Sequence, residues 1–194
     1  LLDWLREHGV RDAVLCASAT APSGCARRSA RADRSGSRCI TRSRTEPLGT
    51  GGALLHARAC VNGPALVVNG DTLATLDPWA LERDRWERGA VGAVALFEVA
   101  DARSRGRVEC DERSRVRGFV EKDEAHRGPA WVNGGVYAFA PALWTRCRPE
   151  RRRSSATCCR GSPPAASSWA RLPGEFFDIG TPEEWERAER RFAS

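Results

Sequence analysis

Alternating helix and strand signals constrain the fold of this chain more than any other feature of its sequence. Residues 1–10 have the spacing of an amphipathic helix that ends at Gly9, and residues 13–16 form a short apolar run typical of a strand. Further along, strands follow one another with little helix between them, at 107–110, 116–120 and 131–139. Strands interleaved with helices and followed by a strand-rich region predict an α/β three-layer domain with a mixed sheet.

Capping residues mark the start of two further helices. Asp77-Pro78 combines an N-cap residue with a proline in the first turn, which predicts a helix from there to Arg88. Thr181 with Glu184 three residues later is a capping box, and Pro182 between them suits the first helical position. We expect this last helix to present one apolar stripe, made of Trp185, Ala188 and Phe192. The remaining expected elements are a helix at 52–60 and strands at 65–68 and 90–99.

Two segments, 17–45 and 145–173, depart from this pattern. Each contains seven arginines, one acidic residue and very few large apolar side chains. Such a composition cannot build a buried face, so we expect irregular or disordered structure in both segments. A second hypothesis is that both are out-of-frame translations of a G+C-rich gene, because the chain has 30 arginines and a single lysine, Lys122. Resequencing the gene distinguishes a frame error from a natural insertion.

These two segments also account for the positive charge of the chain. The formal net charge is +6, yet the 136 residues outside the segments carry 17 basic and 23 acidic groups, a net charge of −6. A nucleic-acid-binding surface needs lysines or arginines gathered on a folded face, preferably with aromatic residues between them, and neither segment offers one. We therefore expect no nucleic-acid partner.

The apolar runs and the cysteines of the sequence indicate the cellular compartment in which the protein is expected. No apolar run in the sequence is long enough to span a membrane, and residues 1–10 do not have the pattern of a signal peptide. We expect a cytoplasmic protein with no membrane partner, and a homo-oligomer is compatible with the sequence. The eight cysteines form no C-x-x-C pair, and five lie in the two arginine-rich segments, so free thiols are expected rather than a zinc site or disulfides.

A glycine-rich turn and two aspartates that follow apolar runs point to nucleotide chemistry. Residues 46–53 form the turn, and the apolar run at 64–68 ends in Asn69-Gly70-Asp71. Glycines let backbone N–H groups approach a nucleotide closely, and a carboxylate just past a strand lies where open α/β sheets bind ligands. Asp178 is a second carboxylate that can share a metal ion with Asp71. Each also suits an ordinary structural role, Asp71 in a turn and Asp178 at a helix N-terminus.

Together these motifs resemble those of the sugar-1-phosphate nucleotidylyltransferases, and most of all the guanylyltransferases that act on heptose or mannose 1-phosphate. The resemblance runs through residues 1–16, 46–143 and 174–192. In chain order its motifs are the base-recognition turn 47–53, the strand 67–72 with the first metal aspartate, the sugar-phosphate strands 106–109 and 118–122, the strand 133–137, and the segment 177–182 with the second metal carboxylate. The resemblance implies a single Rossmann-like nucleotidyltransferase domain over residues 1–194, with a mostly parallel sheet.

The resemblance also implies a role for individual residues. Asp71 and Asp178 are the expected ligands of Mg²⁺, a hard cation that takes oxygen ligands, and with Lys122 they are the expected catalytic residues. The expected nucleotide-binding residues are Gly49, Thr50, Gly51 and Gly70. The expected sugar-phosphate-binding residues are Gly106, Glu121, Lys122 and Asn133. The implied reaction transfers a nucleotidyl group from a nucleoside triphosphate, with GTP favoured, to a sugar 1-phosphate and releases pyrophosphate.

One feature of the family is missing and leaves alternatives open. The chain begins at Leu1, without the opening strand and the Gly-Gly-x-Gly-Thr-Arg-Leu loop that cradles the triphosphate. A non-catalytic nucleotidyltransferase-like module and an inactive truncated fragment are therefore alternatives to an active enzyme. A metal-dependent glycosyltransferase is disfavoured, because Asp71-Thr72-Leu73 lacks a second aspartate. We expect the chain as written to be inactive and marginally stable, since domain stability is only about 5 to 15 kcal/mol and a missing strand leaves a sheet edge unpaired.

Overall fold

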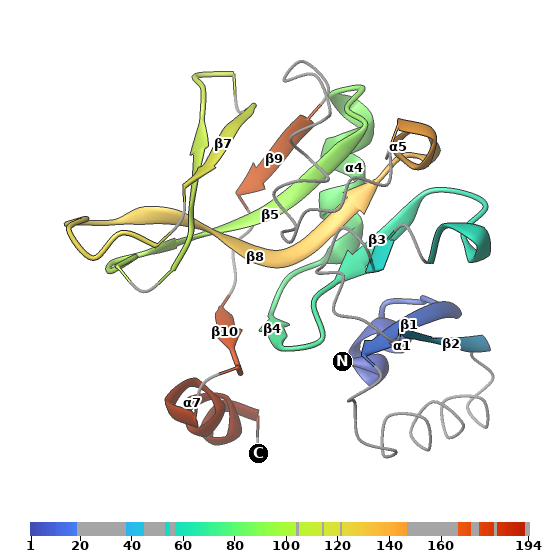
Figure 1. Cartoon of the computed structure of the whole chain (residues 1–194), viewed down its shortest axis with the longest axis horizontal. Coiled ribbons are helices and arrows are strands. Elements are labelled where there is room, and N and C mark those ends of the chain that lie inside the picture. The colour runs from blue at the N-terminus through green and yellow to red at the C-terminus, as the bar shows by residue number, and fades with distance from the viewer. Residues whose placement is uncertain are drawn as a thin grey trace. The chain divides into compact units, whose positions relative to one another are not determined.

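The computed structural model describes residues 1–18, 38–44, 53–54, 57–103, 105–113, 115–120, 122–146, 167–171, 175–180 and 182–192. The chain divides into two compact units, labelled by element in Figure 1. The first unit comprises Leu1–Gly63 and Trp144–Gly161, and the second comprises Pro64–Leu143 and Ser162–Ser194. This division describes compactness only, so the expectation of a single domain over residues 1–194 stays a prediction.

The first unit contains a short helix and a parallel pair of strands. Helix α1 (Leu2–Glu7) is followed by Gly9 with a φ of +79°, a left-handed conformation that glycine adopts without steric cost. Strand β1 (Asp12–Ser18) pairs in parallel with β2 (Arg38–Arg44). The predicted helix and strand near the N-terminus are confirmed. Of the helix predicted at 52–60, residues 53, 54 and 57 are helical and the 3₁₀ turn η1 (Arg58–Cys60) follows, while residues 52, 55 and 56 lie outside the described residues.

The second unit is built on a six-stranded sheet with the order β7-β6-β8-β5-β9, in which β3 also pairs with β8. Its strands are β3 (Ala65–Val68), β5 (Gly92–Val99), β6 (Arg107–Cys110), β7 (Val116–Val120), β8 (Ala130–Phe139) and β9 (Ser167–Arg171). Figure 1 shows β8 as the long curved strand that joins the two ends of this sheet. The strand predictions at 65–68, 107–110, 116–120 and 131–139 are confirmed, and the strand predicted at 90–99 begins at Gly92.

The sheet is mixed, as expected, but the described strands do not make it mostly parallel. Parallel pairing occurs between β1 and β2 and between β5 and β9. Strand β8 is antiparallel to β3, β5 and β6. The chain returns through the β6–β7 hairpin before it enters β8, so β8 runs against its neighbours. The expectation of a mostly parallel sheet is therefore wrong for this part of the chain, while the α/β class is confirmed.

Regular structure also occurs inside the two arginine-rich segments. Strand β2 lies within residues 17–45, and β9 lies within residues 145–173. The expectation that these segments are irregular is wrong at those residues. Both strands pair in parallel with a neighbour, β2 with β1 and β9 with β5, and these pairings come from backbone groups. Strand formation of this kind depends on tertiary context, which the composition of a segment does not reveal.

The core of the second unit lies where β5 and β8 pair and helix α4 (Pro78–Glu87) covers them. Residues 92–97 of β5 and 134–139 of β8 are buried without interruption, as in strands that are covered on both faces. Leu81 of α4 is completely buried. Asp77 accepts a hydrogen bond from the Trp79 N–H at 2.9 Å, which confirms the predicted N-cap.

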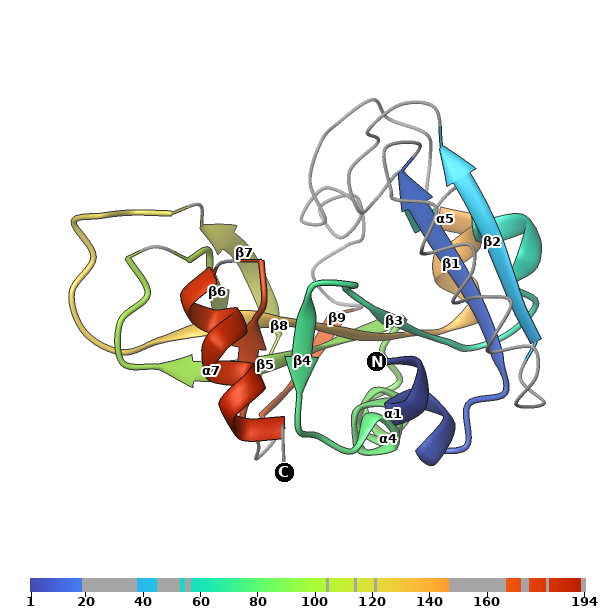
Figure 2. The ribbon, with the colours of Figure 1, turned by 90° about the horizontal axis from the view of Figure 1, so that it is seen from below.

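A smaller antiparallel pair and the last helix complete the second unit. Strand β4 (Thr72–Ala74) pairs with β10 (Phe176–Asp178), and α7 (Pro182–Phe192) follows β10. Figures 1 and 2 show β10 and α7 on one side of the β5–β8 part of the sheet. Of the expected apolar stripe, Ala188 is buried but Trp185 is half exposed; Thr181 of the capping box lies outside the described residues.

Helix α5 (Pro141–Arg146) follows β8. None of the helices in the described part of the chain is long and apolar enough to cross a membrane.

Candidate functional site

The β4–β10 pair brings Asp71 and Asp178 together, although they are far apart in the sequence. Asp178 lies opposite Thr72, the neighbour of Asp71, in the antiparallel register. The Ile179 N–H donates a hydrogen bond to the Asp71 carbonyl oxygen at 2.9 Å. A Cβ atom placed on Gly180 would lie 3.1 Å from Asp178 Oδ1 and 4.0 Å from Asp71 Oδ2. The two carboxylates therefore face the same small space beside Gly180.

This pair of carboxylates is open to solvent and has few protein partners. Asp71 is exposed, Asp178 is half-buried, and Asp178 Oδ1 accepts a hydrogen bond of 3.3 Å from the Gly180 N–H. Two carboxylates that reach solvent suit a hard divalent cation that keeps waters or phosphate oxygens as its other ligands. No group of three or more His, Cys, Asp or Glu residues is placed to hold a metal ion in the described ranges. The donor set at Asp71 and Asp178 fits a cation shared with a substrate.

The turn before Asp71 rests on the backbone of β8. The Asn69 N–H donates to the Gly135 carbonyl oxygen at 2.8 Å. Gly135 has a φ of +69°, and a Cβ atom there would lie 2.7 Å from Thr72 Oγ1 and 3.0 Å from Asn69 Nδ2. Only glycine fits this position without displacing the turn. Sequence reasoning did not single out Gly135; the two consecutive glycines inside a predicted strand were the available signal of a close backbone approach.

Asn133 has a clear structural task in the same strand. Its Oδ1 accepts a hydrogen bond from the Gly135 N–H at 2.9 Å, and its Nδ2 donates to the Tyr137 hydroxyl at 2.6 Å. The β5–β8 register shifts here, since Val94 lies opposite Tyr137 while Leu96 lies opposite Asn133. The Asn133 side chain thus spans a β-bulge. Asn133 therefore lies beside Gly135, which supports the turn before Asp71. Its predicted contact with a sugar stays a prediction.

Gly106 and Lys122 lie at one end of the β6–β7 hairpin. Arg107 pairs with Val120, so the residue before β6 and the residues after β7 are neighbours. A Cβ atom on Gly106 would lie 3.4 Å from the Val120 carbonyl oxygen. Lys122 is exposed, and its predicted role in binding the sugar phosphate stays a prediction.

The remaining predicted site residues lie either in an exposed turn or outside the described residues. Gly70 lies exposed in the turn before Asp71, and no atom lies within 4 Å of the place that a Cβ atom would take there. Glu121 and the nucleotide-binding residues Gly49, Thr50 and Gly51 lie outside the described residues. Their predicted roles are therefore not tested.

Cys110 of β6 does not supply a nucleophile. Cys16, Cys60 and Cys110 are free thiols, as expected. Burial, with a smaller effect of the Asp111 charge, raises the pKa of Cys110 to about 11. This thiol is therefore protonated near neutral pH and unreactive.

Comparison with known proteins assigns the chain to a family. Residues 1–189 match the family described as nucleotidyl transferase. The chain belongs to the nucleotidyl transferase family. A crystal structure of HddC from Yersinia pseudotuberculosis superimposes with a TM-score of 0.84 at 25% identity, over 99% of this chain and 83% of that one. The Rossmann-like fold implied by the sequence motifs is thereby confirmed.

Two of the curated relatives that the chain matches are guanylyltransferases. The chain is 26% identical over 188 residues to the mannose-1-phosphate guanylyltransferase catalytic subunit beta of Drosophila pseudoobscura pseudoobscura, a match that covers 95% of this chain and 50% of that protein. It is 29% identical over 141 residues to the D-glycero-alpha-D-manno-heptose 1-phosphate guanylyltransferase of Campylobacter jejuni, covering 72% of this chain and 61% of that protein. The chain thus spans about half the length of the curated relatives it matches.

Proposed function

We propose that this protein transfers a nucleotidyl group from a nucleoside triphosphate, with GTP favoured, to a heptose or mannose type sugar 1-phosphate and releases pyrophosphate. The observation that carries the proposal is the convergence of Asp71 and Asp178 beside Gly180 in a chain of the nucleotidyl transferase family. The preference for GTP and for these sugars rests on the names of the relatives, which act on mannose 1-phosphate and heptose 1-phosphate.

Asp71 and Asp178 are the proposed ligands of Mg²⁺. Their oxygens face one space, and their exposure leaves room for waters and for phosphate oxygens. When bound, Mg²⁺ neutralises the crowded phosphate oxygens and helps to hold the attacking and leaving oxygens in line. The chain's own contribution is to fix both carboxylates on the antiparallel β4–β10 pair, so that neither has to move when the substrates arrive.

The sugar 1-phosphate is proposed to lie against the Gly106 and Lys122 end of the β6–β7 hairpin. Lys122 supplies a positive charge for its phosphate, and the lack of a side chain on Gly106 lets backbone approach the ligand. Glu121 is the proposed acceptor for sugar hydroxyls, with Asn133 of β8 as a further proposed contact of the sugar. Gly49, Thr50, Gly51 and Gly70 are the proposed contacts of the nucleotide, by backbone approach to base and ribose.

The test is a pyrophosphate-release assay on protein expressed from the complete coding sequence. GTP, UTP, dTTP and CTP are each offered with mannose, heptose and glucose 1-phosphates, in the presence of Mg²⁺. We expect the highest kcat/KM with GTP and a mannose or heptose 1-phosphate, and loss of activity when the metal is chelated. The proposal is refuted when no combination of nucleotide and sugar 1-phosphate releases pyrophosphate. Binding of GTP without turnover favours the non-catalytic module instead.

A further inference from the structure

Arg105 connects two parts of the second unit that the proposed reaction needs together. It directly precedes Gly106, and its backbone N–H donates to the Ala102 carbonyl oxygen at 3.0 Å. Its Nη2 lies 3.2 Å from Oε1 of Glu184 on α7, and the two side chains are only 21% and 20% exposed. Its Cζ lies 5.3 Å from the centre of the Phe176 ring on β10. One side chain from the hairpin thus contacts both the strand and the helix around Asp178.

The contact with Phe176 matters because of where that ring lies on β10. Side chains alternate along a strand, so Phe176 and Asp178 project to the same side of β10. The Phe176 ring also stacks on Phe97 of β5, with ring centres 5.5 Å apart. Phe97 in turn fills the space left by Gly134, where any Cβ atom would overlap its ring. Phe176 is therefore held between the main sheet and the Arg105 guanidinium.

The ion pair with Glu184 also connects Arg105 to the opposite face of β10, through Arg187 and Phe177. Glu184 Oε1 also lies 3.1 Å from Nη1 of Arg187, whose Cζ lies 4.7 Å from the centre of the Phe177 ring. Phe177 is 1% exposed, and consecutive residues of a strand point to opposite faces. Two guanidinium groups, over Phe176 and over Phe177, thus meet at one carboxylate. This arrangement fixes the residues that immediately precede Asp178.

The other end of the connection is the proposed sugar-phosphate site. Arg105 and Gly106 enter β6 opposite the end of β7, where Val120 precedes Glu121 and Lys122. Any displacement of Arg105 along the strand therefore moves this end of the hairpin relative to β10. An arginine suits the position because its planar guanidinium can lie over a ring and present several N–H donors in fixed directions to a carboxylate, whereas the compact ammonium of lysine lacks that planar set of donors.

We propose that Arg105 is a positioning residue that couples the Lys122 end of the hairpin to the strand that carries Asp178. The inference rests on the proposed function for its catalytic consequence, because it assigns the phosphate of the sugar to Lys122 and the metal to Asp178. Arg105 itself does not touch the reacting atoms. It sets the distance between the group that holds the acceptor phosphate and the carboxylate that holds the metal.

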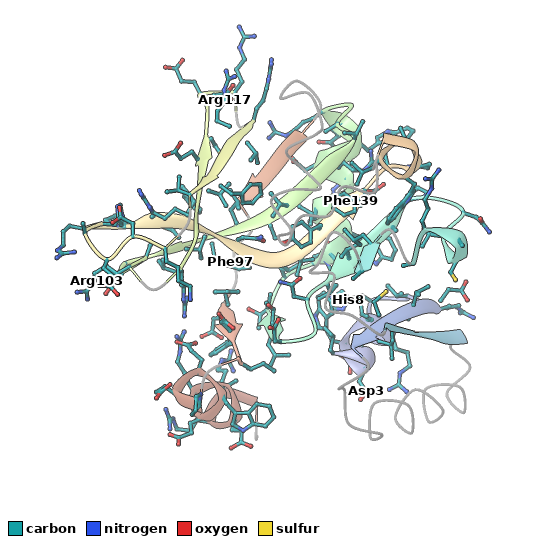
Figure 3. All side chains as sticks on the ribbon, in the orientation of Figure 1. Asp3, His8, Phe97, Arg103, Arg117 and Phe139 are labelled. Carbon is teal, nitrogen blue, oxygen red and sulfur yellow. The ribbon has the colours of Figure 1, made fainter. Side chains whose placement is uncertain are left out.

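The experiment compares Arg105→Gln, Arg105→Lys and Glu184→Gln with the matched control Arg103→Gln in the full-length protein. Arg103 pairs with Asp101 in the same loop, but both side chains are about half exposed. Figure 3 shows Arg103 at the outer end of that loop, away from Phe97. The control removes the same charge, two residues away, without touching β10 or α7.

Amide hydrogen exchange and steady-state kinetics are the two readouts. A coupling of the size usual for contacting residues predicts that Arg105→Gln speeds exchange in β10 and at the end of β7 about tenfold, with Glu184→Gln similar and Arg105→Lys intermediate. It also predicts rises of about tenfold in the half-saturating Mg²⁺ concentration and in KM for the sugar 1-phosphate, with KM for the nucleotide changing less than about twofold. Arg103→Gln should match wild type in every readout.

Two results overturn the inference. In the first, Arg105→Gln behaves like Arg103→Gln in both readouts. In the second, Arg105→Gln lowers the melting temperature and speeds exchange throughout the second unit, but leaves the Mg²⁺ and sugar-phosphate constants unchanged, as a merely structural residue would. If wild type shows no turnover with any substrate pair, the proposed function fails. The exchange comparison between β10, β7 and the rest of the sheet then decides the coupling by itself.

Discussion

The two halves of the candidate site are held in place by different forces. The turn with Asp71 rests on the backbone of β8, where Gly135 leaves no space for a Cβ atom and Thr72 is buried. The hairpin that precedes Lys122 carries partly exposed ion pairs, Arg107 with Asp123 and Arg117 with Asp111. Close packing admits one arrangement, whereas partly exposed ion pairs contribute little each and tolerate adjustment. The metal half should therefore be rigid and the sugar-phosphate half adjustable.

The largest expected effect comes from removing either carboxylate of the metal half. Asp71→Asn and Asp178→Asn should each lower turnover about a hundredfold or more, because one of two anionic ligands is lost and phosphate charge is poorly neutralised. The fold should stay intact, since both side chains reach solvent. Turnover at several Mg²⁺ concentrations and a circular dichroism spectrum provide the check. Near-normal activity at ordinary Mg²⁺ would return that aspartate to a structural role.

A smaller but still large effect is expected from Gly135→Ala, which tests whether packing fixes the metal half. The methyl group would meet Thr72 Oγ1 at 2.7 Å in a left-handed backbone conformation, so a loss of about 2 kcal/mol in unfolding free energy is expected. The half-saturating Mg²⁺ concentration should rise as the turn before Asp71 shifts. Gly118→Ala on β7 is the control, because nothing lies within 4 Å of its Cβ position. Equal melting curves for the two variants would show that packing does not hold the turn.

Lys122→Gln tests the adjustable half and should have a moderate effect. Loss of one exposed positive charge should raise KM for the sugar 1-phosphate about tenfold, while KM for the nucleotide and thermal stability change little. Arg117→Gln is the control, since Arg117 is exposed on β7 and pairs with Asp111 at 2.9 Å near the opposite end of the hairpin. Figure 3 shows its position there. A larger change in nucleotide KM than in sugar-phosphate KM would contradict the assignment.

The smallest expected effect concerns the turn between β6 and β7. Hydrogen bonds from the Arg115 and Arg113 N–H groups, with the charges of Arg117 and Arg115, lower the pKa of Asp111 from 3.8. A lowered pKa in the folded state stabilises the fold above the unfolded-state pKa, and this contribution is lost as pH falls through the folded-state value. Asp111→Asn should therefore lower the melting temperature slightly, by about 1 to 2 °C, at neutral pH and not in strong acid.

Glu112→Gln, at an exposed position in the same turn, is the control for that experiment. The mechanism predicts that the difference in melting temperature between Asp111→Asn and wild type shrinks as the pH falls. A difference that grows instead would contradict it. Amide hydrogen exchange in β6 and β7, measured on the same variants, shows whether the increased mobility of the turn extends to Gly106 or stays within the turn.

Local patterns in the sequence predicted much of the second unit. Asp77 caps a helix as expected, and β3, β6 and β7 have the predicted bounds. These elements depend on interactions within a few residues, such as an N-cap hydrogen bond or an apolar run between turns, so the sequence records them directly. The strands β2 and β9, which lie in the two arginine-rich segments, were not foreseen, because their partners β1 and β5 supply the backbone pairing.

For the candidate site, the sequence by itself determined the residue types: two aspartates after apolar runs, one lysine, and glycines where backbone must approach closely. Only the tertiary structure decided which of them meet. Asp71 and Asp178 face the same space because β4 and β10 pair in one register, and Gly135 supports them because β8 bulges beside the turn. Arg105 has no distinguishing motif at all. Its contacts with Phe176 and Glu184 arise from segments distant in the chain, and pairing between distant segments is specified by the packing of the whole unit rather than by any local pattern.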